Sequence, residues 1–163
     1  MQARTRQTCL LAVVVLGLAV VLAGATLAQP SDPRLGTWKL NTAKSTYAAG
    51  TAPRSVTFAN EAAGAGVKVT VETVAADGTV THWGYTANYD GKDYPVTGNP
   101  SRESVAATRI DANTVKSVYK KGGKVTLTQT SVVSSDGKTI TITSTGTNDQ
   151  GQAVKSVGAY DKQ

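Results

Sequence analysis

Residues 125–143 read VTLTQTSVVSSDGKTITIT, and this stretch decides the fold. From Val125 to Val133 every second residue shares one face, and threonine and isoleucine alternate strictly over 139–143. Alternation of this kind is typical of β-strands, in which successive side chains point to opposite faces of a sheet. Asp136-Gly137 lies between the two runs and predicts a tight turn. The stretch therefore predicts an antiparallel β-hairpin.

Short strands separated by turn signals account for the rest of the chain after residue 34. Asp77-Gly78 predicts a type I′ hairpin, because that turn needs positive φ at both central positions. Pro95 has no backbone N–H and indicates an edge or a bulge in its strand. The segment 41–53 is rich in small residues, and we expect a loop or a brief helical turn there. The strands are predicted at 36–40, 55–60, 67–74, 80–89, 92–96, 104–110, 115–119, 125–133, 139–145 and 153–160.

Closure of the sheet follows from this pattern of strands. No stretch shows sustained helical periodicity, and each strand is joined to the next by a short turn. Such a meander has two exposed edges, and closing it into a barrel removes both. The sequence therefore predicts an all-β fold, an antiparallel up-and-down barrel of about eight to ten strands, in preference to a β-sandwich. Residues 35–163 are predicted to form this single domain.

The first 28 residues differ in kind from the rest. Arg4 and Arg6 precede an apolar run from Leu10 to Leu22, and small residues follow up to Ala28. This order predicts a secretory signal peptide over 1–28 that is cleaved after Ala28. The alternative is an uncleaved membrane anchor, but the apolar run is shorter than the roughly 20 residues that a spanning helix needs.

Cleavage would define the chemistry of the mature chain. It removes Cys9, the single cysteine. The full sequence has a net charge of +6, and the mature chain stays mildly basic, with its lysines scattered along the sequence. Disulfides and thiol chemistry are then excluded, and the lysine distribution does not predict a nucleic-acid site. We expect a flexible lead-in over 29–34, a location in the periplasm or the medium, no stable membrane anchor and a monomer.

Catalytic motifs are absent from the sequence. His82 is its single histidine. It could act as a general base or an axial ligand, but parity places it on the strand face opposite Trp83 and Tyr85, which favours a surface or rim position. No Gly-x-Ser-x-Gly motif, phosphate loop or calcium loop occurs. We expect neither an enzyme nor a bound metal or cofactor.

Arg109 is the first candidate for a ligand contact. It shares parity with Val105 and Ala107 in an otherwise small and apolar segment. An inward-facing guanidinium group could bind the anionic head group of a ligand, because its fork of donors fits a carboxylate. The alternative is an arginine at the rim, facing outward, or paired with a carboxylate such as Asp111.

Aromatic side chains supply the other candidates. They combine a large apolar body with a polar handle and could line the wall of a pocket. They could equally be core residues, in a sequence that has a single phenylalanine. The candidates are Trp83, Tyr85, Tyr89, Tyr94 and Tyr119.

The segment 35–40, LGTWKL, resembles the opening strand of the calycins, the lipocalins and intracellular fatty-acid-binding proteins. The signature residues are Gly36 and Trp38, and the resemblance implies that Trp38 closes one barrel end beside a basic residue of the last strand. Two features depart from the fatty-acid-binding branch. The segment 41–53 is too short for its helical lid, and Gly158-Ala159-Tyr160 stands where that branch has Arg-x-Tyr. The chain most resembles small bacterial exported proteins described as lipocalin-like.

Function is predicted from this resemblance together with the composition. We expect an exported barrel that binds a small, partly apolar or anionic ligand in its lumen. The alternative is an exported structural or interaction protein, such as an inhibitor or envelope accessory, whose barrel is filled. Small residues dominate the sequence, and inside a barrel they leave either a cavity or a narrow filled bore.

Overall fold

The computed structural model describes residues 32–48, 52–147 and 153–163. The predicted signal peptide lies outside these residues. All regular structure in the described part is β-strand. The strands are β1 (Gly36–Thr46), β2 (Ser55–Ala63), β3 (Gly66–Val74), β4 (Val80–Asn88), β5 (Asp90–Thr97), β6 (Ser104–Arg109), β7 (Thr114–Lys121), β8 (Lys124–Val133), β9 (Thr139–Thr147) and β10 (Ala153–Lys162).

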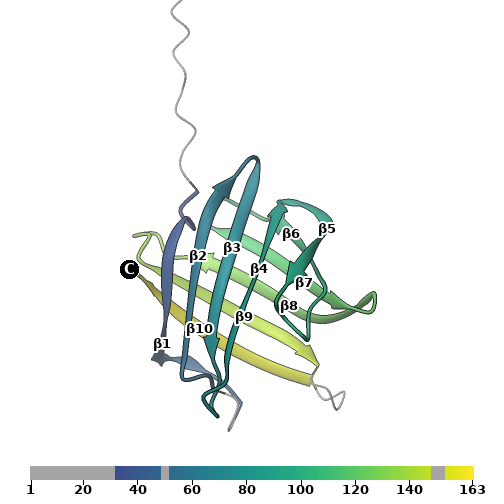
Figure 1. Cartoon of the computed structure of the whole chain (residues 1–163). Helices are drawn as coiled ribbons and strands as arrows, with labels where there is room; N and C mark the ends of the chain where they lie inside the picture. The colour runs from purple at the N-terminus through teal and green to yellow at the C-terminus, as the bar shows by residue number, and fades with distance from the viewer. Residues whose placement is uncertain (1–31, 49–51, 148–152) are drawn as a thin grey trace, which may run out of the picture. The chain divides into compact units, whose positions relative to one another are not determined.

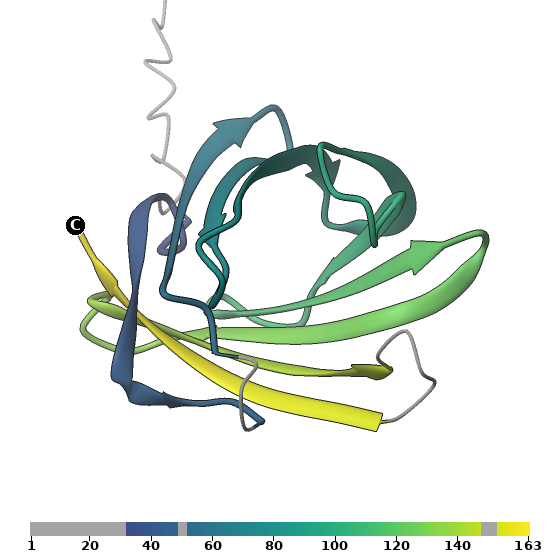
Figure 2. The ribbon, with the colours of Figure 1, turned by 60° about the horizontal axis from the view of Figure 1, so that its bottom comes forward.

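The ten strands form a closed antiparallel barrel. Each strand pairs with its neighbours in the sequence, and β10 returns to pair with β1 (Figures 1 and 2). The predicted fold class is confirmed, and it is the fold that the resemblance to the calycins implies. Closure excludes the alternative, a β-sandwich, because the two sheets of a sandwich each have edge strands and a closed sheet has none. A search of the described residues finds no helix that could span a membrane.

Trp38 closes the barrel where its first and last strands meet. The residue is fully buried, and its Nε1 donates to the Arg34 carbonyl at 2.9 Å. Trp38 pairs in register with Lys162 of β10, whose Nζ lies 5.2 Å from the centroid of the indole ring. A basic residue of the last strand thus packs on this tryptophan, as the resemblance implies. Gly36, two residues earlier, has a φ of 118°, and a Cβ atom there would lie 3.0 Å from Lys162 Cε.

The first strand is longer than the sequence pattern predicts. β1 continues to Thr46, through residues for which a loop or helical turn is expected. Its register with β10 shifts between Asn41 and Thr46. The Ser45 hydroxyl stabilises this bulge, because it donates to the Asn41 carbonyl at 2.7 Å and accepts from the Ala159 N–H at 2.9 Å. A bulge breaks the strict period of two, and this hides the continuation of the strand from pattern analysis.

The prediction of a type I′ turn at Asp77-Gly78 is wrong. Within the described residues, positive φ occurs only at glycine, so the aspartate does not adopt the required conformation. The N–H of Gly78 instead donates to the Ala75 carbonyl at 3.0 Å, and Asp77 Oδ1 accepts the N–H of Thr79 at 2.8 Å. The aspartate stabilises a longer turn through its own side chain.

One seam of the barrel is weakly paired. β4 and β5 share only the pairs Gly84–Thr97 and Tyr85–Val96. Pro95 lies directly before this short ladder and has no N–H to donate to it. The register of β5 with β6 also shifts between Asp90 and Asp93. The predicted bulge is found in this strand, but it lies between Asp90 and Asp93 and not at Pro95, which pairs in register with Ser104.

The two ends of the barrel differ. The turns from β2 to β3, β4 to β5, β6 to β7 and β8 to β9 lie at one end, with residues 32–35, and we call it the closed end. The turns from β3 to β4, β5 to β6 and β7 to β8 lie at the other, the open end. Four of the largest fully buried side chains, Trp38, Val67, Val115 and Ile140, lie on the closed-end halves of their strands.

Candidate functional site

Inward-facing side chains leave a cavity of about 450 Å³ inside the barrel. Many come from alternate positions of β2, β3, β4, β7, β8 and β9, as the pleat of a strand requires. The lining extends from Arg34 at the closed end to Asn99 and Pro100 at the open end. The volume falls within the roughly 300–1,000 Å³ that sites for small molecules occupy.

Part of the cavity wall is aromatic. Phe58 of β2 and Tyr160 of β10 meet edge to face, with ring centroids 5.0 Å apart. Trp83 and Tyr85 of β4 lie beside Tyr119 of β7, with centroids 6.1 and 6.2 Å from its ring. The aliphatic lining residues are Val56, Val69, Val71, Leu127, Ile140 and Ile142. This wall offers apolar area that a ligand could cover.

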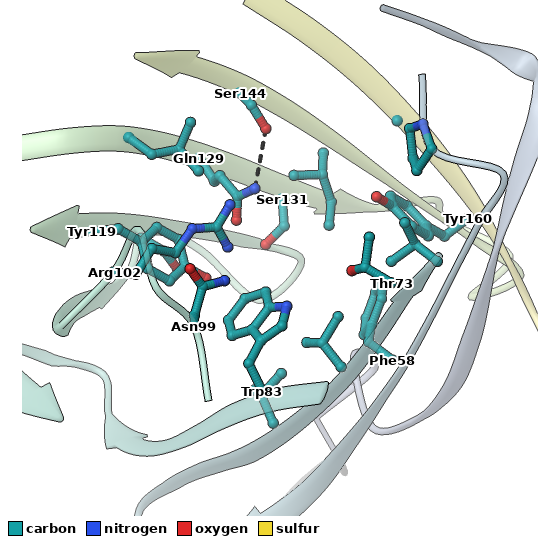
Figure 3. Close-up of a pocket in the computed structure, with 18 of the residues that line it drawn as sticks. Phe58, Thr73, Trp83, Asn99, Arg102, Tyr119, Gln129, Ser131, Ser144 and Tyr160 are labelled. Carbon is teal, nitrogen blue, oxygen red and sulfur yellow. Dashed lines mark hydrogen bonds between the residues drawn. The ribbon is translucent and has the colours of Figure 1, made fainter. Parts of the chain in front are cut away.

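The strands β7, β8 and β9 contribute a polar wall. Gln129 Nε2 donates to Ser144 Oγ at 3.1 Å (Figure 3), and Ser131 Oγ donates to the Val115 carbonyl at 3.2 Å. Ser117 of β7 also lines the cavity and is buried. The lumen is therefore amphipathic, since apolar rings and polar side chains share its lining.

Arg102 reaches the cavity from the connection between β5 and β6. Its Cζ atom lies 4.7 Å from the ring centroids of both Trp83 and Tyr119. Contacts of this kind attract a guanidinium group to the faces of aromatic rings. Among the described residues, none forms a hydrogen bond or ion pair with this guanidinium group. Its donors are available to a ligand or to water.

A cluster of four side chains, Asp32, Arg34, Tyr89 and Arg109, lies at the closed end. Tyr89 Oη donates to Asp32 Oδ2 at 2.9 Å and accepts from Arg34 Nη2 at 2.8 Å. Arg109 also donates to Asp32, and its Cζ lies 4.2 Å from the centroid of the Tyr89 ring. Residues 32–34 belong to the predicted flexible lead-in, but these contacts tie them to the barrel. Residues 29–31 lie outside the described part.

Arg34 is the most buried charged residue of the cluster, with 5% of its surface exposed. Its carbonyl accepts from Trp38 Nε1 and, at 2.8 Å, from Asn60 Nδ2. Its Nε and Nη1 make no hydrogen bond within the described residues. Asp32 lies 4.0 Å from Nε but also pairs with Arg109. The cluster thus holds two cations and one anion.

The pKa values of Asp32, Tyr119 and Tyr160 follow from burial and hydrogen bonding. Burial acts to raise the pKa of Asp32, but hydrogen bonds from Arg109, the Arg34 N–H and Tyr89 outweigh it, so the pKa lies below its usual value. Burial raises the pKa of Tyr119, and also that of Tyr160, above the ordinary value. Both phenols are therefore neutral at pH 7.

A second, more open depression of about 700 Å³ lies along the outer face of the strands β2 to β5. Lys68, Glu72, His82 and Thr97 are among the residues that border it. His82 Nδ1 lies 3.7 Å from Glu72 Oε2, and 71% of the histidine side chain is exposed. The prediction that His82 lies opposite Trp83 on the surface is confirmed.

The predicted site residues fall into two groups. Trp83, Tyr85 and Tyr119 line the cavity together. Arg109 and Tyr89 lie in the closed-end cluster instead, and Arg109 is paired with a carboxylate, as the alternative prediction has it, although the partner is Asp32 and not Asp111. A role in binding stays a prediction for all five. Tyr94 lies outside the cavity lining as well, and its hydroxyl donates to Asp90 at 3.0 Å.

Sequence reasoning did not find Arg102 or Arg34. Arg102 follows Pro100 in the connection between β5 and β6, where the alternation of a strand does not assign a side chain to a face. Arg34 contacts Tyr89, a partner 55 positions away in the sequence. Gln129 carried a usable signal, because it shares the alternation from Val125 to Val133 on which the fold prediction rests.

Comparison with known proteins gives one distant structural likeness. No family model matches the sequence, and no curated protein matches it. The chain is similar to the crystal structure of zebrafish ileal bile acid-binding protein complexed with cholic acid, with 13% sequence identity and a TM-score of 0.48. The match covers 80% of this chain and 99% of that chain. At this identity and score it carries no argument about what the present chain binds.

Proposed function

We propose that this chain is a binding protein that takes up a small, partly apolar ligand in the lumen of its barrel. The cavity of about 450 Å³ carries this proposal. A barrel of small side chains could have been packed solid, and the alternative of a filled interaction protein requires that. A cavity of this volume, with aromatic walls and a few polar groups, is typical of small-molecule binding.

Binding without catalysis agrees with the position of the titratable groups. Among the described residues, a histidine and a carboxylate come together at His82 and Glu72, on the outer face. More than half of each side chain is exposed, at 71% and 52%. General acid–base catalysis works best from a positioned and environmentally tuned group. We interpret this pair as a contact between two solvent-exposed side chains.

The proposal is tested by titrating the purified protein with the neutral fluorophore N-phenylnaphthylamine. Ser131→Phe would place a large ring in the lumen, because Ser131 lines the cavity. Thr130→Phe adds the same ring one position earlier, where the pleat points it outward. We expect the first variant to weaken binding by about tenfold or more and the second to bind like the wild type.

Two results would contradict the proposal. One is the absence of saturable binding to the folded wild-type protein. The other is equal binding by the two phenylalanine variants, which would place the fluorophore outside the lumen. Far-ultraviolet circular dichroism of each variant checks that the barrel has formed.

We further propose that the protein is exported to the periplasm or the medium after cleavage at Ala28. The basic start, apolar run and small residues of 1–28 support this proposal. Intact-mass measurement of the protein from its own host should give a chain that begins at Gln29 and lies outside the cytoplasm. A full-length cytoplasmic chain would contradict it.

A further inference from the structure

The charge of the cavity lining is unbalanced. Arg34 and Arg102 line the lumen, and among the described residues no aspartate or glutamate does. Asp32 compensates part of the charge at the closed end, but it is shared between Arg34 and Arg109. Tyr119 and Tyr160 also line the lumen, and burial raises the pKa of both phenols, so neither adds a negative charge at pH 7. The lumen is therefore electropositive, and low-dielectric walls strengthen such a field.

Arg102 is positioned to receive a ligand group. Trp83 and Tyr119 hold its Cζ at 4.7 Å from each ring centroid, so the guanidinium group is kept in the lumen. A guanidinium group has five N–H donors and no acceptor, and none of these donors is engaged by a described residue. A partly buried charge without a counter-charge is unfavourable until an anion pairs with it.

Neighbouring side chains add further donors. Asn99 Oδ1 accepts the N–H of Ser101 at 2.9 Å, which leaves the Asn99 amide group as a donor. Figure 3 shows Asn99, Arg102 and Gln129 extending toward the same part of the cavity. The Ser117 hydroxyl lies in the same lining and can also donate. This part of the lumen therefore offers amide and hydroxyl donors beside the guanidinium group.

We propose that the ligand of the lumen is an organic anion, and that its carboxylate or sulfonate group pairs with Arg102. Its apolar body would cover the rings of Phe58 and Tyr160. This inference rests on the proposed function and adds the charge of the ligand and the residue that recognises it. Arg34 contributes to the field, but its Nη2 is engaged by Tyr89 and its free nitrogens are buried.

Two fluorophores with the same aromatic body test the inference. Anilinonaphthalene sulfonate carries a negative charge, and N-phenylnaphthylamine is neutral. We expect Arg102→Gln to weaken binding of the sulfonate by about tenfold or more, because a charge-assisted contact is lost. Binding of the neutral amine should stay within about twofold of wild type.

Arg54→Gln is the matched control. Arg54 also lies at the open end, but its Nε donates to the Ala76 carbonyl at 2.9 Å and it does not line the cavity. Both fluorophores should bind this variant as they bind the wild type. Arg102→Lys keeps the charge without the planar fork, and we expect an intermediate loss for the sulfonate.

Salt gives a measurement that does not depend on any variant. Added sodium chloride should weaken binding of the sulfonate to the wild-type protein and leave the neutral amine unaffected. This result keeps the inference testable if Arg102→Gln fails to fold.

The outcomes separate the two proposals. Failure of both fluorophores to bind the wild type would overturn the proposed function and this inference together. Binding of both, with equal affinity of the sulfonate for wild type and Arg102→Gln, would overturn this inference and leave the proposed function standing. An equal loss for both fluorophores in Arg102→Gln would also overturn it, because Arg102 would then act by packing alone.

Discussion

Asp32 carries the negative charge of the closed-end cluster and faces the guanidinium groups of Arg34 and Arg109. These neighbours and the Tyr89 hydroxyl hold the pKa of Asp32 below its usual 3.8. A carboxyl group whose pKa is lower in the folded than in the unfolded state stabilises the fold above the unfolded value. This stabilisation is lost as the pH falls through the folded pKa.

We predict that Asp32→Asn lowers the free energy of unfolding by about 2 kcal/mol at pH 7, because two cations lose their counter-charge. The difference from wild type should shrink below about pH 4, where the unfolded wild-type carboxyl becomes protonated. Urea denaturation at pH 7 and pH 3 measures both quantities.

Asp93→Asn is the control for a surface charge. Asp93 accepts from Lys120 Nζ at 2.8 Å, and 48% of its side chain is exposed. Exposed pairs contribute below about 1 kcal/mol, so this variant should cost less than Asp32→Asn. An Asp32→Asn protein as stable as wild type at pH 7 would show that the cluster does not stabilise the barrel.

Turns are the elements in which sequence and structure differ most. Asp136-Gly137 predicts a tight hairpin, and the chain does turn there, with the Gly137 N–H donating to the Ser134 carbonyl at 2.9 Å. Asp136 Oδ1 accepts the N–H of Lys138 at 3.0 Å, so the aspartate supports the turn through its side chain. Gly122-Gly123 adopts positive φ at both positions, which the type I′ turn requires.

Gly137 provides a prediction at this scale. Its φ is 69°, and a Cβ atom there would meet nothing within 4 Å, so only backbone conformation opposes substitution. We predict that Gly137→Ala costs about 1 kcal/mol and that Gly137→Asn costs less, because asparagine tolerates the left-handed region. Thermal denaturation of the two variants measures the difference. Equal stability of both variants would contradict a turn with positive φ at this position.

The alternation of side chains between the two faces of a strand makes the strands predictable from the sequence. It gives much less information about the connections between them. The period of two placed Trp83 and Tyr85 on one face and His82 on the other, because the pleat fixes those directions. Arg102 lies in a connection, where no periodicity applies. Arg34 lies before the first strand and owes its burial to partners distant in sequence. Strand patterns can therefore find lining residues that lie on strands, such as Trp83 and Gln129, but they miss those before β1 and in the connections.

At the scale of the whole molecule, the barrel has one blocked end and one end that its cavity approaches. Trp38 and the closed-end cluster block the first, through contacts that join residues before β1 to β2, to Tyr89 between β4 and β5, and to β6. The loop that carries Asn99 and Arg102 borders the second. The proposed organic anion would bury its apolar body in the lumen between these ends while its charged group pairs with Arg102.

Two hollows compete as the binding site, the lumen and the outer depression beside His82. The lumen is lined by buried rings such as those of Tyr119 and Tyr160, whereas the depression is more open to solvent and is bordered by the exposed side chains of Glu72 and His82. Apolar ligands gain most from the site that removes them from water. We therefore propose that the ligand binds inside the barrel.

Amide chemical shifts of the labelled protein, followed by NMR during titration with N-phenylnaphthylamine, test this claim most directly. We predict that the largest saturable changes fall on lumen-lining residues of β7 to β9, including Ser117, Gln129 and Ser144. Changes confined to Thr70, His82 and the outer face of β3 and β4, or no saturable change, would contradict a ligand-binding lumen.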